Sequence, residues 1–246
     1  MHVKAQDLSF TDESDGTKKA EFDVMAVGFG DNGIPVDQTS RSYTVSLRKD
    51  VYEKFLKEGF VYDFTFPIKK PGAYQLRVAI RDKKTEKVGS ANQSVEVPNL
   101  KKNRLTLSGV VLENMSFNDW QKFNAGQTPS VETNALNDTS MRQFKRGTVV
   151  NYGFTIFNAK IGAARDPSLN AQIRLFRDGK PLFEGKSQPV PTRTRADPTR
   201  VGYAASLSLG TVLAPGDYVL QIVITDSLAK EKRNTAIQFV QFEVVD

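Results

Sequence analysis

The sequence contains one stretch twice: Pro71-Gly72-Ala73-Tyr74-Gln75-Leu76-Arg77-Val78-Ala79-Ile80-Arg81-Asp82 and Pro215-Gly216-Asp217-Tyr218-Val219-Leu220-Gln221-Ile222-Val223-Ile224-Thr225-Asp226. The two copies share Pro, Gly, Tyr, Leu, Ile and Asp in the same register, and each is followed by a charged turn and a closing strand. Apolar residues alternate along both copies, which is the pattern of a half-buried antiparallel strand. Two copies near the ends of two halves predict two similar domains in tandem.

The repeated stretch also indicates the type of β domain. In immunoglobulin-like sandwiches a tyrosine near the start of strand F bonds the backbone at the preceding corner, and Tyr74 and Tyr218 match that position. Leu76 and Leu220 stand where antibody domains carry a core cysteine, so packing alone would hold the sheets together. We therefore predict an all-β chain of two tandem immunoglobulin-like β-sandwich domains, residues 1–98 and 104–246, joined by a short linker at 99–103.

Turn and helix signals complete this outline. Asp31-Asn32-Gly33 and Asp178-Gly179 lie between apolar runs and predict hairpin turns. The segment from Asp50 to Gly59 has a helical pattern, with Asp50 as the expected N-cap, and gives the first domain one short helix. Two segments of the second domain, 113–146 and 187–201, are longer than ordinary turns, and such long loops are usually functional or partly structured.

Composition excludes most catalytic devices. The chain has 246 residues, no cysteine and a single histidine, His2. Structural zinc sites, thiol nucleophiles, disulfides and a Ser-His-Asp triad are therefore ruled out. Paired carboxylates remain the only plausible catalytic device, but the candidate aspartates fall at turns, where aspartate is expected for backbone reasons. We predict that the chain is not an enzyme and has no catalytic residue, cofactor or metal ion.

One motif resembles a nucleotide site and is better explained as a turn. Residues Gly28 to Gly33 match the spacing of a dinucleotide-binding loop, which requires a helix to begin at the last glycine. The residues that follow, Ile34-Pro35-Val36, are typical of an extended strand instead. A hairpin turn is therefore the preferred interpretation.

Charge and hydropathy bear on partners. The chain carries 34 basic and 28 acidic side chains, a net charge of +6, and the whole excess lies after residue 98. These charges are spread over predicted strands and turns, so we expect no nucleic-acid partner. We expect no transmembrane segment, because no run approaches the apolar length that spans a bilayer. The first residues have no signal-peptide layout and read as the middle of a strand, so we expect a fragment of a longer protein.

Four residues in the two long segments are the candidate binding residues. Trp120 lies in a stretch with Phe117 and Phe123, which either seals the end of the sandwich or contacts a partner or glycan. Arg193, Arg195 and Arg200 follow prolines at 189 and 191, and they belong either to a solvated loop or to a site for an acidic partner. Both alternatives remain open for each segment.

A set of motifs then resembles one family. In order along the chain they are Leu105-Thr106-Leu107-Ser108-Gly109-Val110-Val111-Leu112, Arg142-Gln143-Phe144-Lys145-Arg146-Gly147, Phe157-Asn158-Ala159, Leu175-Phe176-Arg177-Asp178-Gly179-Lys180-Pro181-Leu182-Phe183-Glu184-Gly185, Pro215-Gly216-Asp217-Tyr218-Val219-Leu220 and Phe242-Glu243-Val244. With Gly72-Ala73-Tyr74-Gln75-Leu76-Arg77-Val78 and Val95-Glu96-Val97-Pro98-Asn99-Leu100, they resemble the C-terminal region of bacterial VWFA-related proteins, in which a von Willebrand factor type A domain precedes such a region.

The resemblance implies an exported protein, periplasmic, secreted or on the cell surface, with an upstream type A domain. It carries over no metal site, because the Asp-x-Ser-x-Ser motif of the type A domain does not occur in this chain. The function expected from the sequence is a non-catalytic structural or interaction module. Its expected partner is a protein or a surface polysaccharide, and an acidic partner is one of the alternatives. The alternative is a carbohydrate-binding module that acts through the aromatic segment 113–146.

Overall fold

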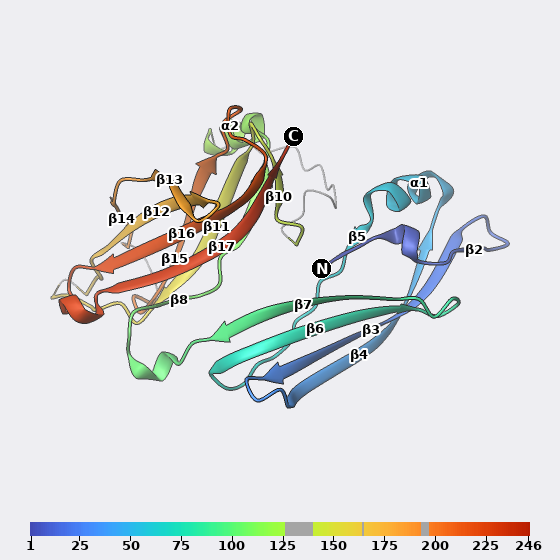
Figure 1. The fold of residues 1–246 in the computed structure, drawn as a ribbon, viewed down its shortest axis with the longest axis horizontal. Coiled ribbons are helices and arrows are strands. Elements are labelled where there is room, and N and C mark those ends of the chain that lie inside the picture. Colours follow the sequence, from blue (N-terminus) through green and yellow to red (C-terminus); the bar gives the residue numbers. More distant parts are fainter. Residues whose placement is uncertain (126–139, 164, 193–196) are drawn as a thin grey trace. The chain divides into compact units, whose positions relative to one another are not determined.

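The structure, a computed structural model, describes residues 1–125, 140–163, 165–192 and 197–246. The chain divides into two compact units, of which the first comprises Met1–Asn99 and the second begins at Leu100 (Figure 1). Both units are built mainly from antiparallel strands. The prediction of an all-β fold is therefore confirmed, while the immunoglobulin-like type of each unit stays a prediction.

Unit 1 is a twisted sheet with a thinner second layer. The sheet has the order β4-β3-β6-β7, with β2 also paired to β3, and the second layer contains the short β1–β5 ladder. The hairpin turn expected at residues 31–33 joins β3 to β4. The elements are β1 (His2–Val3), η1 (Ala5–Asp7), β2 (Thr11–Asp12), β3 (Lys18–Gly30), β4 (Pro35–Leu47), α1 (Lys49–Glu58), β5 (Phe60–Val61), β6 (Gly72–Asp82) and β7 (Val88–Val97).

The core of unit 1 is covered by aromatic side chains from the segment 60–66. Phe60, Tyr62, Phe64 and Phe66 pack against buried side chains of β3. Glycine is needed at Gly28, because a Cβ there would lie 2.8 Å from a ring carbon of Phe66.

The cover over β6 and β7 is less complete. Leu76, predicted to be a core residue, is only partly buried. The neighbouring strand β7 is exposed along most of its length. The aromatic layer therefore shields β3 better than the outer part of the sheet.

The N-cap of the helix in unit 1 lies two residues earlier than the sequence suggested. α1 begins at Lys49, and its N-cap is Arg48, which has extended backbone and no capping side chain. The expectation that Asp50 caps the helix is wrong, because Asp50 lies inside the first turn and pairs with the Arg48 guanidinium at 3.0 Å. Its negative charge still favours the positive end of the helix dipole. Gly59 ends the helix at φ +70°, as its position predicted.

Unit 2 is a sandwich of two sheets. The larger has the order β10-β17-β16-β12-β13, with β14 also paired to β12, and the smaller has the order β15-β11-β8, with β9 also paired to β11. The elements are η2 (Leu100–Lys102), β8 (Thr106–Leu107), β9 (Val111–Met115), α2 (Phe117–Asn124), β10 (Gln143–Lys145), β11 (Val149–Phe157), β12 (Leu169–Arg177), β13 (Lys180–Glu184), β14 (Gln188–Pro189), β15 (Arg200–Ser208), β16 (Gly216–Asp226), η4 (Glu231–Arg233) and β17 (Thr235–Val245).

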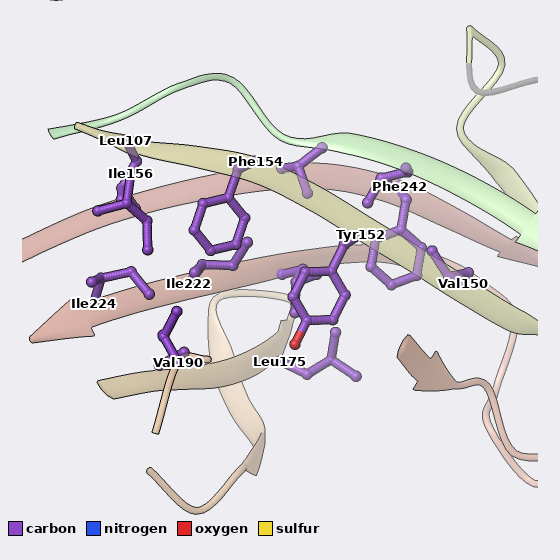
Figure 2. Close-up of a cluster of buried hydrophobic side chains, with 14 of the residues drawn as sticks. Leu107, Val150, Tyr152, Phe154, Ile156, Leu175, Val190, Ile222, Ile224 and Phe242 are labelled. Carbon is purple, nitrogen blue, oxygen red and sulfur yellow. The ribbon is translucent and has the colours of Figure 1, made fainter. Parts of the chain in front are cut away.

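The core of unit 2 lies between these sheets. Figure 2 shows Tyr152, Phe154 and Ile156 of β11 pointing toward Ile222 and Ile224 of β16. Tyr218, Leu220, Ile222 and Ile224 are at most 1% exposed, as the alternation in the second repeat predicted. Each buried side chain of this size stabilises the fold by about 1.5–3 kcal/mol relative to an exposed one.

The two copies of the repeated strand are held in the same way at their first ends. The Tyr74 hydroxyl donates to the carbonyl of Lys70 at 2.8 Å, and the Tyr218 hydroxyl donates to the carbonyl of Ala214 at 2.6 Å. Each tyrosine thus fixes the chain as it enters β6 or β16, which is the tyrosine corner that the sequence predicted.

A buried aspartate holds the other end of each copy. Asp82 and Asp226 are 1% and 0% exposed. From the turn that follows, Asp82 accepts the backbone N–H groups of Lys84 and Thr85, and Asp226 accepts that of Leu228. Each carboxylate also accepts one N–H from a distant segment, Ser9 at 2.7 Å for Asp82 and Lys160 at 2.7 Å for Asp226. The repeat contained this aspartate, but the sequence analysis gave it no role.

We predict that each unit folds without the other, because each buries a hydrophobic cluster of its own. The separate fragments 1–99 and 100–246 should each give a single cooperative thermal transition by circular dichroism. A gradual, non-cooperative melt of either fragment would show that the unit depends on its neighbour.

Candidate binding surface in the second unit

The structure separates the candidate binding residues from one another. Trp120 belongs to α2, as do Phe117 and Phe123, while Arg200 is the first residue of β15. Trp120 contacts Ser206, six positions along β15 from Arg200, which corresponds to roughly 20 Å at the usual rise of a strand. Arg193 and Arg195 lie outside the described residues. Trp120 and Arg200 therefore mark two ends of one strand and do not form one compact site.

The helix α2 was missed by the sequence analysis, although a signal for it exists. Ser116 precedes the helix, and its hydroxyl accepts the N–H of Asp119 at 3.0 Å and donates to the Asp119 carboxylate at 2.6 Å. This Ser-x-x-Asp spacing is the pattern of a capping box. Phe117 and Trp120 are three positions apart on the helix, and their rings stack with centroids 5.5 Å apart.

Trp120 anchors α2 to the outer face of the smaller sheet. Its indole N–H donates to the Ser206 hydroxyl at 3.2 Å, and that hydroxyl donates to the side-chain oxygen of Asn151 at 2.7 Å. Ser206 and Asn151 face each other across the β15–β11 ladder. Within unit 2, α2 lies at the end of the sandwich opposite η4 (Figure 1).

Arg200 marks the other end of this face. Its guanidinium lies 5.6 Å from the ring centroid of Phe157, its partner in the ladder. The nearby Asp197 carboxylate accepts the hydroxyl and the N–H of Thr199, at 2.6 and 2.9 Å. These two bonds lower the pKa of Asp197, and the charge of Arg200 lowers it further. Asp197 is therefore ionised at neutral pH.

Between these ends the outer face of the smaller sheet is hollowed. The hollow has a volume of about 510 Å³. Its floor is formed by Gly153 and Thr155 of β11 opposite Ala204 and Gly202 of β15. Val111 of β9, 66% exposed, lies at its side. The sequence held a signal for this hollow, because every outward position of β15 after Arg200 carries a small residue: Gly202, Ala204, Ser206 and Ser208.

The hollow offers contact surface and hydroxyl groups. The Ser108 hydroxyl is engaged, since it accepts the N–H of Thr155 and donates to the carbonyl of Gly109. The ring of Tyr203 packs on the core side, 5.5 Å from the Phe154 ring, and burial raises the pKa of its phenol, which is neutral at physiological pH. Among the residues that the structure describes, no group of three or more His, Asp or Glu side chains could hold a metal ion.

A scan against protein-family models and a search of the curated proteins found no match. The resemblance to VWFA-related proteins, and the export that it implies, therefore stay predictions. In the described part of the chain, no helix has the length and apolar character to cross a bilayer.

Proposed function

We propose that the chain is a non-catalytic interaction module of an exported bacterial protein, and that the outer face of the smaller sheet in unit 2 contacts its partner. The observation that carries the proposal is the hollow over Gly153, bounded by an anchored aromatic pair at one end and an exposed arginine at the other. A floor made of paired strands needs little ordering when a partner binds, which lowers the entropic cost of contact.

The chemistry of the face supports binding more than catalysis. The polar groups nearest the hollow are mainly hydroxyls and an amide, which are hydrogen-bonding groups at neutral pH, and the charged Glu113 and Arg200 lie toward opposite ends of the face. The motifs that resemble VWFA-related proteins support the exported context. The second candidate function, a carbohydrate-binding module, is favoured by Phe117, which is 47% exposed and stacked on Trp120.

Site-specific photo-crosslinking tests the proposed face. A photoreactive phenylalanine analogue in place of Val111 should form a covalent product with a defined component of the bacterial envelope. The control position is Val88 of β7 in unit 1, which has a similar exposure of 63%, against 66% for Val111. We expect a product from position 111 and none of the same mass from position 88.

The result that contradicts the proposal is equally plain. Identical product patterns from both positions, or no product from position 111, would show that this face is not where the chain contacts its partner.

A further inference from the structure

Gly153 occupies the middle of a central strand, where packing does not require glycine. A Cβ at this position would come no closer than 3.7 Å to any described atom, which is ordinary contact. The register of β11 with β15 runs through Gly153 without a shift. On the other side of β11, Gly153 is the last residue paired with β9, and the register changes by one residue before β8 begins. Glycine weakens a strand interior, and it often marks a bulge in the ladder or a place where a ligand approaches the backbone closely. Because a Cβ would have room at Gly153, its absence leaves open space above the floor.

We propose that the hollow over Gly153 binds an acidic oligosaccharide, with its sugar rings on the floor of the hollow and a carboxylate at Arg200. This inference rests on the proposed function, because it names the ligand of the same face. Three observations support it: the pairing of β11 on both sides beneath the hollow, the side chains around the floor, and the distribution of charge along it.

The backbone of β11 beneath the hollow is paired on both sides, so a peptide strand cannot join the sheet over this face and could add only at the outer edge of β15. Gly153 pairs with Ala204 on one side and with Val111 on the other. Ser108 and Thr155 exchange two further bonds, from the Ser108 N–H to the Thr155 carbonyl and from the Thr155 N–H to the Ser108 hydroxyl. A peptide that adds to a sheet needs free backbone groups at a strand edge. A ligand on this face must be recognised by side chains and by close contact.

A sugar ring matches those requirements. A pyranose has an apolar C–H face, which packs on a flat floor or on an aromatic ring, and a rim of hydroxyl groups. Gly153, Gly202 and Ala204 form such a floor. The hydroxyl of Thr155 lies within the hollow, while Ser206 and Asn151 lie beyond Ala204 toward the exposed ring of Phe117 and the indole of Trp120. An apolar surface with a few convergent polar groups is typical of a small-ligand site.

The charges beside the hollow determine the orientation in which an acidic ligand would bind. Glu113 lies opposite Asn151 in the β9–β11 ladder, at the α2 end, and Arg200 lies at the other end. The neighbouring Asp197 is ionised and offsets part of the Arg200 charge, while one of its carboxylate oxygens accepts both bonds from Thr199. A carboxylate on the sugar is therefore repelled at the α2 end and attracted at Arg200, whose guanidinium fork suits carboxylates.

Trp120 gives this proposal a built-in reporter, because it is the only tryptophan in the chain. The full chain is titrated with two acidic probes, tetragalacturonate and a hyaluronan tetrasaccharide, and with two neutral ones, cellotetraose and chitotetraose. We expect at least one acidic probe to produce a saturable change in Trp120 emission, with the neutral probes binding at least tenfold more weakly.

Variants then locate the ligand. Gly153→Val should weaken binding of the acidic probe at least tenfold by filling the hollow. The matched control is Gly89→Val on β7 of unit 1, where a Cβ also meets only ordinary contact, at 3.5 Å, and it should leave the affinity unchanged. Arg200→Ala removes an exposed side chain and should leave the fold intact. It should reduce the affinity for the acidic probe to that for the neutral ones. Circular dichroism verifies that each variant is folded.

Two results would overturn the inference. One is the absence of any change in Trp120 emission with all four probes. If position 111 nevertheless forms a crosslink to an envelope protein, the proposed function is supported and only the sugar ligand is excluded. The other is equal affinity for the acidic probe in the wild type and in a folded Gly153→Val variant. Neutral probes that bind as tightly as acidic ones would overturn the role given to Arg200.

Discussion

Leu220→Ala is expected to destabilise unit 2 by about 2–5 kcal/mol, the range found for truncation of a fully buried leucine. Leu220 is 0% exposed and belongs to the cluster between the two sheets. Its loss leaves a cavity that paired strands on both sides cannot easily close. Urea unfolding followed by the fluorescence of Trp120 measures the effect directly, because the only tryptophan lies in this unit.

The matched comparison is the same substitution at the equivalent position of unit 1. Leu76 is only partly buried, so Leu76→Ala should cost about 1–2 kcal/mol, in proportion to the smaller apolar area withdrawn from water. Hydrogen exchange, resolved by peptide, reports on unit 1 in the intact chain. Equal losses at the two positions would mean that the cover over β6 is more complete than the structure indicates.

Asp82→Asn should destabilise unit 1 by about 2–4 kcal/mol at pH 7, because a buried carboxylate that accepts several hydrogen bonds is replaced by a neutral amide. The Asp82 carboxylate accepts hydrogen bonds from Ser9, Lys84 and Thr85 at 2.7–3.0 Å. Burial raises the pKa of Asp82, but the hydrogen bonds from Ser9, Thr85 and Lys84 outweigh it and hold the pKa below the ordinary value of 3.8.

The direction of that shift fixes the pH dependence. A carboxyl group whose pKa is depressed on folding contributes stability above its unfolded pKa and loses it as the pH falls through the folded value. The difference between wild type and Asp82→Asn should therefore be full at pH 7 and should shrink below pH 3.8. Hydrogen exchange of unit 1 peptides across that range, with the exposed Asp50→Asn as control, tests this. A difference that does not change with pH would exclude the carboxylate charge as its cause.

The strand framework could be predicted because a period of two in apolar residues depends only on which face of a sheet is buried. The repeat identified β6 and β16, and the signals Asp31-Asn32-Gly33 and Asp178-Gly179 both lie at hairpin turns. The extent of burial could not be predicted. Leu76 and Leu220 occupy the same register in the repeat, and the second layer opposite each strand decides how far each is covered.

The binding surface was harder to predict, because its hollow results from small residues, which carry no chemical signal of their own. Sequence reasoning selected Trp120 and Arg200 for their chemistry, and it passed over Gly153 and the small residues of β15, which create the space between them. Ser116 and Asp119 could have revealed α2. The contact between Trp120 and Ser206, 86 positions apart in the chain, follows from tertiary packing and has no local signal.

The tyrosine and the aspartate that secure the ends of β6 and β16 have a consequence for protein engineering. The bonds that fix these strand ends come from their own corners and turns and from Ser9 and Lys160, and none of these bonds comes from α2. The helix α2 lies between β9 and β10 in the chain and supplies no strand to that framework. Unit 2 is thus a natural scaffold for loop grafting, in which the α2 segment is exchanged as a cassette to give a new specificity on an unchanged β core.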